Sequence, residues 1–229
     1  LRSCSAPLAP DVAQRLEVAF GAPVLPAFGM TEATHQACAV HPSSDTDTRI
    51  HTVGEPTGTE LRIIDESGSS CATGIVGEVW LRGRSIARGY LDNERATAET
   101  FRDGWLRTGD LGSVDSKGIL TLRGRIKNII NRGGEKISPE HVEDVLLAHP
   151  DITQAAVFGR SDTKYGERVT AVVVLRSGAP ADEDLLRGFC ASRLANYEVP
   201  EYISFVEELP TTAKGSVDRN RLASEFGGA

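Results

Sequence analysis

The chain has 229 residues, 40% of them hydrophobic, and a net charge of −7 at pH 7. That length suffices for one large domain or two small ones. The acidic balance argues against nucleic acid or an anionic membrane surface as a general partner. No apolar run approaches the roughly 18 residues of a membrane-spanning helix, so no integral membrane segment is expected. The cysteines are Cys4, Cys38, Cys71 and Cys190, and none of them forms a Cys-x-x-Cys pair. They therefore predict neither a metal site nor a disulfide framework, and a cytoplasmic location is expected.

The chain opens with a turn between a predicted strand and a predicted helix. This turn consists of Ser5, Ala6 and Pro7. Residues 24–28 are apolar and end at Gly29, which predicts a short buried strand. Thr31 and Glu32 follow at the carboxyl end of that strand, where open α/β sheets usually bind ligands. Glu32 is a hard oxygen donor suited to Mg²⁺, although a Thr-Glu pair also suits a helix N-terminus.

From residue 53 to residue 122 the sequence becomes β-rich, with short apolar runs separated by glycine turns. Strands are predicted at residues 61–64, 76–81 and 119–122, which favours a small antiparallel barrel or sandwich. A short helix at residues 94–101 has Asn93 as its predicted cap.

A Gly-Gly pair, Gly133 and Gly134, stands between an apolar run and a predicted helix. Ser138 is placed to cap that helix, Pro139 suits its first position, and Glu140 suits its positive end. On these residues alone, the glycine pair is equally consistent with a plain tight loop.

The remaining residues predict a compact α+β unit. The run at residues 169–175 is continuously apolar, which predicts a strand buried on both faces. A helix is expected at residues 182–194, with Leu185, Leu186 and Phe189 facing the core. Other elements are expected at residues 139–148, 155–158 and 202–206.

Five sequence blocks occur in a fixed order along almost the whole chain. They are Phe28-Gly29-Met30-Thr31-Glu32, Gly77-Glu78-Val79-Trp80-Leu81-Arg82-Gly83, Gly89-Tyr90, Gly104-Trp105-Leu106-Arg107-Thr108-Gly109-Asp110 and Gly124-Arg125-Ile126-Lys127. In order and wording they resemble the adenylate-forming enzymes, a superfamily of acyl-CoA synthetases, luciferases and peptide-synthetase adenylation domains. The resemblance is to the AMP-forming fatty-acid and 4-coumarate ligase type, in its C-terminal portion.

The resemblance implies an α/β fold with a β-barrel subdomain and two domains. Residues 1–126 correspond to the end of the large ATP- and acyl-binding domain, and residues 127–229 to a small, mobile α+β domain. The family's phosphate-binding loop has no counterpart in this sequence. We therefore expect an N-terminal part of the same enzyme as a partner, and a homodimer is also compatible with the resemblance.

Several residues take family roles by this resemblance. Asp110 offers two acceptor oxygens to the 2′ and 3′ hydroxyls of a ribose, although a carboxylate after a Thr-Gly turn is also typical of an Asx turn. Arg125 is expected near the ribose or the phosphates of ATP, and Glu32 at Mg²⁺. Further residues expected at the nucleotide or acyl group are Ser5, Ala6, Pro7, Phe28, Gly29, Met30 and Thr31.

The second domain takes its expected roles from the same resemblance. Lys127 stands at the hinge about which that domain rotates between two half-reactions. Gly133 and Gly134 allow the backbone to approach the thiol arm of coenzyme A without a Cβ in the way. Lys164 and Arg168 are either contacts for CoA phosphates or solvated turn charges.

The sequence departs from the family at its adenylation lysine. The family pattern is Pro-x-Thr-x-x-Gly-Lys, and aligning Pro210, Thr212 and Gly215 puts Ser216 at the lysine position. A hydroxyl supplies no positive charge to the transition state, and losing one such interaction typically costs on the order of 10² to 10³ in rate. Three interpretations stay open: Ser216 is an introduced substitution, Lys214 acts in its place, or the enzyme adenylates weakly.

These observations predict an enzyme that forms an acyl-adenylate from a carboxylic acid and Mg-ATP and passes the acyl group to coenzyme A. One alternative is an acyl-AMP ligase or adenylation domain that loads a carrier protein. Another is a non-catalytic fragment that binds a nucleotide or CoA, which Ser216 and the missing phosphate loop both favour.

Overall fold

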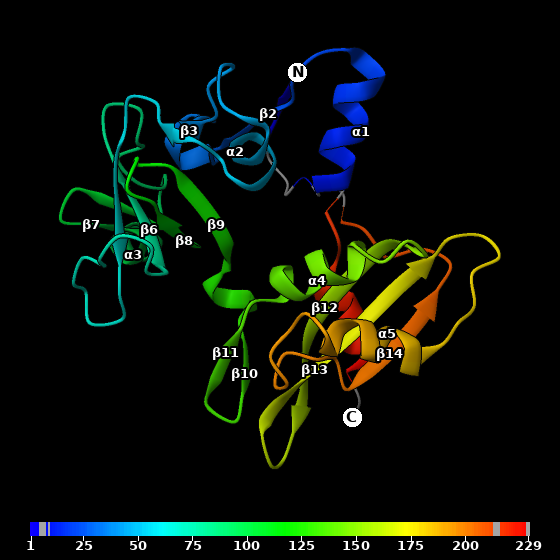
Figure 1. The fold of residues 1–229 in the computed structure, drawn as a ribbon. Coiled ribbons are helices and arrows are strands. Elements are labelled where there is room, and N and C mark those ends of the chain that lie inside the picture. The colour runs from blue at the N-terminus through cyan, green and yellow to red at the C-terminus, as the bar shows by residue number, and fades with distance from the viewer. Residues whose placement is uncertain (5–7, 9, 213–215, 228–229) are drawn as a thin grey trace. The chain divides into compact units, whose positions relative to one another are not determined.

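Two units make up the chain in the computed structural model, which describes residues 1–4, 8, 10–212 and 216–227 (Figure 1). Unit 1 comprises Leu1–Ile126 and unit 2 comprises Lys127–Ala229. Each unit is built on buried apolar clusters of its own. Among the helices in the described ranges, none is long and apolar enough to cross a membrane.

The first sheet of unit 1 has four strands in the order β1-β2-β3-β4. β1 and β2 run parallel, whereas β3 and β4 extend the sheet in antiparallel pairs. Apolar residues before Gly29 form β2, as the sequence predicts, and its end, Ala27 and Phe28, is buried. The bounds are β1 (Arg2–Ser3), α1 (Pro10–Phe20), β2 (Leu25–Phe28), β3 (Cys38–Ala39), α2 (Thr46–His51) and β4 (Glu55–Pro56).

The second sheet of unit 1 is antiparallel and has five strands, in the order β5-β6-β8-β7 with β9 paired to β8. The three predicted strands correspond to β5, β6 and β9, and Asn93 caps α3 through its side-chain oxygen, as expected. The bounds are β5 (Glu60–Ile64), β6 (Gly77–Arg82), α3 (Glu94–Thr100), β7 (Phe101–Arg102), β8 (Trp105–Val114) and β9 (Leu120–Arg125). An α/β part with an added antiparallel β part matches the expected fold class.

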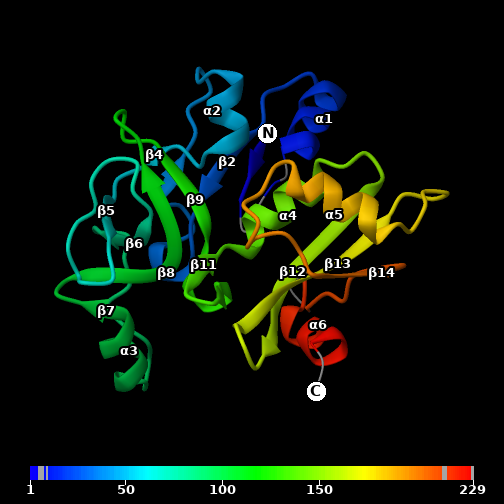
Figure 2. The same ribbon diagram turned by 60° about the horizontal axis from the view of Figure 1, so that its bottom comes forward.

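Unit 2 contains a five-stranded sheet in the order β11-β10-β13-β12, with β14 parallel to β13. Helices α4 and α5 cover one face of this sheet and α6 covers the other (Figure 2). Successive residues of β13 belong alternately to the apolar cluster on one face of the sheet and to the cluster on the other face. The prediction of a strand buried on both faces is therefore confirmed. The bounds are β10 (Ile130–Arg132), β11 (Glu135–Ile137), α4 (Pro139–Leu147), β12 (Ile152–Asp162), β13 (Gly166–Leu175), α5 (Glu183–Ala191), β14 (Tyr202–Val206) and α6 (Arg219–Phe226).

Three details of unit 2 differ from the sequence prediction. The glycine pair does not lead into the helix, because the short strand β11 intervenes. Ser138 occupies the N-cap position of α4, but its hydroxyl donates to Glu140 Oε2 at 3.1 Å instead of capping the helix. In α5, Leu186 and Cys190 are buried while Leu185 is exposed, because residues four apart share a helix face and adjacent residues do not.

Candidate active site

The turn after β2 places the first group of predicted residues. Gly29 and Met30 lead from the strand into a 3-10 turn, η1 (Thr31–Ala33). A Cβ on Gly29 would lie 1.9 Å from the carbonyl oxygen of His35, so only glycine fits where the chain folds back on itself. Thr31 is the first residue of η1 and not its N-cap, which is Met30. The carboxylate of Glu32 is therefore presented from a tightly constrained turn.

Tyr90 holds the carboxylate of Glu32. Its hydroxyl donates to Glu32 Oε1 at 2.7 Å, and this hydrogen bond raises the pKa of Tyr90. The backbone of Ala87 also donates to the carbonyl oxygen of Glu32 at 2.7 Å. The ring of Tyr90 packs edge-on against Phe101 at 5.6 Å. Tyr90 belongs to one of the five sequence blocks, but nothing in the sequence marks its contact with Glu32, since 58 residues separate the partners.

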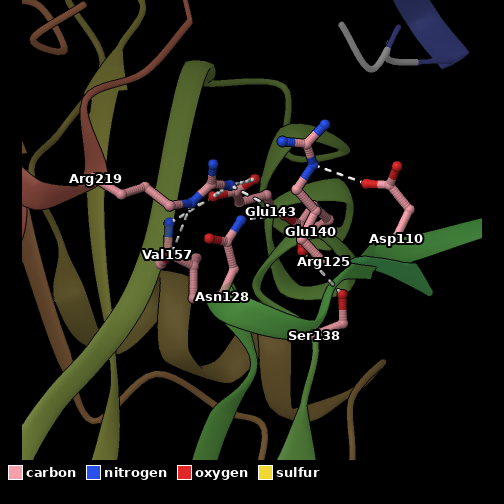
Figure 3. A network of polar contacts seen from close by, with 8 residues as sticks. All are labelled: Asp110, Arg125, Asn128, Ser138, Glu140, Glu143, Val157 and Arg219. Carbon is pink, nitrogen blue, oxygen red and sulfur yellow. Dashed lines mark hydrogen bonds and ion pairs between the residues drawn. The ribbon is translucent and has the colours of Figure 1, made fainter. Parts of the chain in front are cut away.

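Asp110 and Arg125 are brought together by the pairing of β8 with β9. Their Cα atoms are register partners, and Arg125 Nε donates to Asp110 Oδ1 at 2.8 Å (Figure 3). Asp110 is buried, with its side chain only 7% exposed, whereas that of Arg125 is 55% exposed. The two residues expected at the nucleotide therefore lie side by side, one as a fixed buried carboxylate and the other as an accessible cation.

Asp110 does not follow a turn, in contrast to the sequence interpretation. It lies within β8 at an irregularity, where Glu78 pairs with Leu111 but Trp80 pairs with Arg107. Such a bulge kinks a strand and redirects its side chains, which explains how a strand residue can present a carboxylate.

Hydrogen bonds to β6 fix this irregular stretch. The hydroxyl of Thr108 donates to the carbonyl of Val79 at 2.7 Å and accepts from the N–H of Asp110 at 3.1 Å. Glu78, which is buried, accepts from the N–H of Gly109 at 3.2 Å and pairs with Arg107. Sequence reasoning gave Glu78 no role, although a glutamate inside an apolar strand run is a signal for a satisfied buried carboxylate.

Gly133 and Gly134 form the turn of a β10–β11 hairpin. Arg132 pairs with Glu135 across the turn, and both glycines have positive φ, +60° and +97°. A two-residue hairpin turn of this type requires positive φ at both positions, which glycine adopts most easily. Gly133 N donates to the carbonyl of Tyr165 at 2.7 Å, while nothing lies within 4 Å of a Cβ placed on Gly134.

Cations surround the ring of Tyr165, next to this glycine turn. The charged groups of Arg132, Lys164 and Arg168 lie 4.8, 4.9 and 5.0 Å from the ring centroid. Arg132 is bonded to Glu201 at 2.9 Å, and Arg168 is paired with both Asp162 and Glu201, which raises the pKa of Arg168. Arg168 is therefore a paired cation of the fold rather than a solvated turn charge.

Ser216 lies on the second of two paired arms, residues 210–212 and residues 216–218, which together we call the 216 hairpin. Thr212 N donates to Ser216 O at 2.8 Å, their hydroxyl oxygens also lie 2.8 Å apart, and Thr211 pairs with Val217. The side chain of Ser216 is exposed. Lys214, its candidate substitute, lies outside the described residues, as do Ser5, Ala6 and Pro7.

Lys127 is the first residue of unit 2 and lies in a 3-10 turn, η2 (Ile126–Asn128). Its role as the hinge residue stays a prediction.

Two sequence profiles of known families match this chain. The profile of the AMP-binding enzyme covers residues 1–91, and that of the AMP-binding enzyme C-terminal domain covers residues 141–216. The chain belongs to the AMP-binding enzyme family. The resemblance expected from the five blocks is thereby confirmed.

Individual AMP-binding relatives match nearly the whole chain. A probable CoA ligase of Humulus lupulus is 46% identical over 226 residues, which are 99% of this chain and 43% of that protein. An oxalate–CoA ligase of Arabidopsis thaliana is 44% identical over 226 residues, which are 99% of this chain and 44% of that protein. Among solved structures, ATP-bound MatB from Rhodopseudomonas palustris matches with a TM-score of 0.92 and 32% identity, over 99% of this chain and 45% of that chain. The chain thus spans less than half the length of these proteins.

Proposed function

We propose that a full-length protein carrying this chain is an AMP-forming acyl-CoA synthetase. The observation that carries this proposal is the alignment of 99% of the chain with relatives named as CoA ligases, at 46% and 44% identity. The proposed reaction has two halves. A carboxylate oxygen first attacks the α-phosphorus of ATP and pyrophosphate leaves; the thiol of CoA, losing its proton, then attacks the acyl carbon and AMP leaves.

Asp110 and Arg125 are proposed to bind the nucleotide. The buried carboxylate of Asp110 lies in a bulge that hydrogen bonds hold in place, so it is preorganised. Little conformational entropy is lost when it accepts hydrogen bonds from two ribose hydroxyls. The guanidinium of Arg125, which is more than half exposed, is able to reach nucleotide oxygens while it stays near Asp110. Phe28, Gly29, Met30 and residues 5–7 are proposed to line the acyl and adenine pocket.

Glu32 is proposed as the protein ligand of Mg²⁺. Within the described residues, no three or more His, Cys, Asp or Glu side chains gather in a way that would hold a metal ion. A single carboxylate still fits Mg²⁺, which commonly takes one or two carboxylates together with substrate phosphates and water. Bound there, the ion would neutralise phosphate charge, while the hydroxyl of Thr31 would donate to a phosphate oxygen.

Unit 2 is proposed as the mobile domain of the enzyme, and unit 1 as the end of its ATP- and acyl-binding domain. Lys127 would take up the backbone rotation between the two half-reactions, and the turn of Gly133 and Gly134 would face the thiol arm of CoA. An N-terminal part on the same polypeptide and a homodimer are further parts of this proposal. Light scattering of the full-length protein tests the homodimer.

A second candidate, binding of ATP or CoA without turnover, is favoured by one observation. Ser216 stands where the family has its adenylation lysine, and its hydroxyl is engaged with Thr212. The deciding experiment measures ATP–pyrophosphate exchange by the full-length protein and by its Ser216→Lys variant. The panel of acids would include oxalate, a longer dicarboxylate, and aliphatic and aromatic monocarboxylates.

We expect the Ser216→Lys variant to exchange on the order of 10² to 10³ faster than the protein with Ser216. Equal exchange by both would refute the assigned role of position 216 and point to Lys214 or another cation. If neither protein exchanges with any acid but both bind ATP, binding without turnover is the better description. Thioester formation with free CoA, compared with a phosphopantetheinylated carrier protein, then separates a CoA ligase from a carrier-loading enzyme.

A further inference from the structure

A half-buried ionic contact anchors the 216 hairpin to the rest of unit 2. Arg219 is the first residue of α6, directly after the hairpin, and its Nη2 lies 2.6 and 2.7 Å from the two oxygens of Glu143 (Figure 3). The Glu143 side chain is only 13% exposed and that of Arg219 is 27% exposed. The N–H of Val157 in β12 also donates to Glu143 Oε1, at 2.7 Å. Arg219 is thereby attached to both α4 and the central sheet.

The base of the 216 hairpin is attached to α6. The N–H of Asp218 donates to the carbonyl of Pro210 at 2.8 Å, and the Asp218 carboxylate caps α6 by accepting from the N–H of Arg221. Only two residues, Val217 and Asp218, therefore separate position 216 from the half-buried Arg219. We expect a displacement of Arg219 to reach position 216, because the connection is two residues long and both are tied to the other arm, Val217 by its pairing with Thr211 and Asp218 by its hydrogen bond to Pro210.

The contact continues from Arg219 to the segment that contains the proposed hinge. Glu140 Oε1 lies 3.7 Å from Arg219 Nη2 and accepts from Asn128 Nδ2 at 3.2 Å. Asn128 is the last residue of η2 and follows Lys127. One guanidinium thus sits between two carboxylates of α4, and one of these carboxylates holds the residue next to Lys127.

We propose that Arg219 is a positioning residue for position 216, and that Glu143, Glu140 and Asn128 connect it to the hinge segment. This inference rests on the proposed function for its catalytic meaning, but the physical connection can be tested without turnover. Buried ionic contacts often contribute little net stability, yet they fix one geometry among several, which is what a residue that carries a catalytic group requires.

The test measures amide hydrogen exchange at pH 8 in the 216 hairpin, at the N–H groups of Thr212 and Asp218. Arg219→Lys keeps a positive charge but loses the geometry of the guanidinium, and Glu143→Gln keeps the shape but loses the charge. We expect both changes to speed exchange at these amides by about 10-fold or more, because losing a charged hydrogen-bond partner typically has effects of that order. Arg221→Lys is the matched control: Arg221 lies on the same helix and pairs with Glu225, but the two side chains are 63% and 44% exposed.

A second readout separates positioning from a merely structural role. In the Ser216→Lys background, Arg219→Lys should lower the kcat of ATP–pyrophosphate exchange about 10- to 100-fold. The KM for ATP should stay unchanged, since Arg219 is not proposed to touch the nucleotide. Equal behaviour of Arg219→Lys and Arg221→Lys in both readouts would overturn the proposal.

The link to the hinge has its own variant. Asn128→Ala should speed exchange in the 216 hairpin about 2- to 3-fold, because Asn128 reaches Arg219 only through Glu140 and a small part of the lost hydrogen-bond energy is passed on. In the double variant with Arg219→Lys, the fold-increase in exchange should be smaller than the product of the two single fold-increases. An unchanged exchange rate in Asn128→Ala would refute the link to the hinge segment. The role of Arg219 would then be decided by the Arg219→Lys variant alone. Should Ser216→Lys show no exchange with any acid, the proposed function fails, and hydrogen exchange still decides whether Arg219 holds the hairpin.

Discussion

Glu143 should make the stability of unit 2 depend on pH. Burial raises its pKa from about 4.5 to about 7, against the opposing effects of Arg219 and of the Val157 N–H; the neighbouring Glu140 adds to the rise. The folded protein therefore binds this proton more tightly than the unfolded chain does. The contribution of Glu143 to stability is fully present below pH 4.5 and is lost as pH rises through 7.

The magnitude follows from the interval between these two pKa values. Each pKa unit corresponds to about 1.4 kcal/mol, so raising pH from 5 to 8 should cost about 2–3 kcal/mol of unfolding free energy. Glu143→Gln has no proton to lose and should lack this dependence. The difference in stability between the protein and its Glu143→Gln variant should therefore move by about 2–3 kcal/mol in favour of the variant over this range.

Buried thiols offer an assay that resolves the two units. Cys38 lies in the core of unit 1 and Cys190 in that of unit 2, and burial raises their pKa values to about 12 and about 11. Neither should react with a fast thiol reagent until its unit unfolds, so labelling in urea, read by peptide mass spectrometry, gives a midpoint for each.

The Cys190 midpoints of the protein and of Glu143→Gln should diverge between pH 5 and pH 8, while their Cys38 midpoints coincide at every pH. Parallel Cys190 curves would show that the carboxyl of Glu143 has an ordinary pKa, and the argument from burial would be refuted.

Three further predictions use single substitutions. Leu146→Ala should cost about 2–5 kcal/mol and lower the urea midpoint of unit 2 alone, because Leu146 is fully buried in that unit's core; equal shifts in both units would contradict two separate cores. Gly134→Ala should cost about 1–2 kcal/mol because φ is +97° there, whereas Gly188→Ala, in α5 with open space around the added Cβ, should gain about 0.5–1 kcal/mol. A loss at both glycines would refute the conformational argument. Asp110→Asn should weaken ATP binding about 10- to 100-fold in calorimetry, while Asp115→Asn, at an exposed turn, should leave it unchanged.

Most of the fold can be predicted from the spacing of apolar residues along the sequence. The continuous apolar run of β13 identified a strand buried on both faces, and the alternating runs in residues 53–122 identified the antiparallel sheet. The β10–β11 hairpin was missed because each of its strands has only three residues, too few to show a period. The sequence pattern therefore places the glycine pair between a strand and a helix, and not in the turn of a hairpin.

Most errors at the site depend on partners that are distant in the sequence, and one, at Ser138, depends on competition between neighbours. The bulge that carries Asp110 is defined by its register with β6, and register is not visible in one strand alone. Ser138 has the right residue type and position for a cap, but Glu140 competes for its hydroxyl. Arg219 and Glu143 are 76 residues apart, so nothing local marked them as partners. Residue type indicated candidate chemistry, whereas the contacts came from tertiary structure.

The shortness of the joint between the units has a thermodynamic consequence. Arg125 is paired in β9 with Asp110, and only Ile126 separates it from Lys127, where unit 2 begins. A connection this short restricts the orientations that the backbone between the units can adopt, so little chain entropy remains in the joint itself. Flexible glycine-serine insertions after Ile126 would release that restriction, and the entropy of the joint would then grow slowly with the logarithm of its length, although no side chain had been changed.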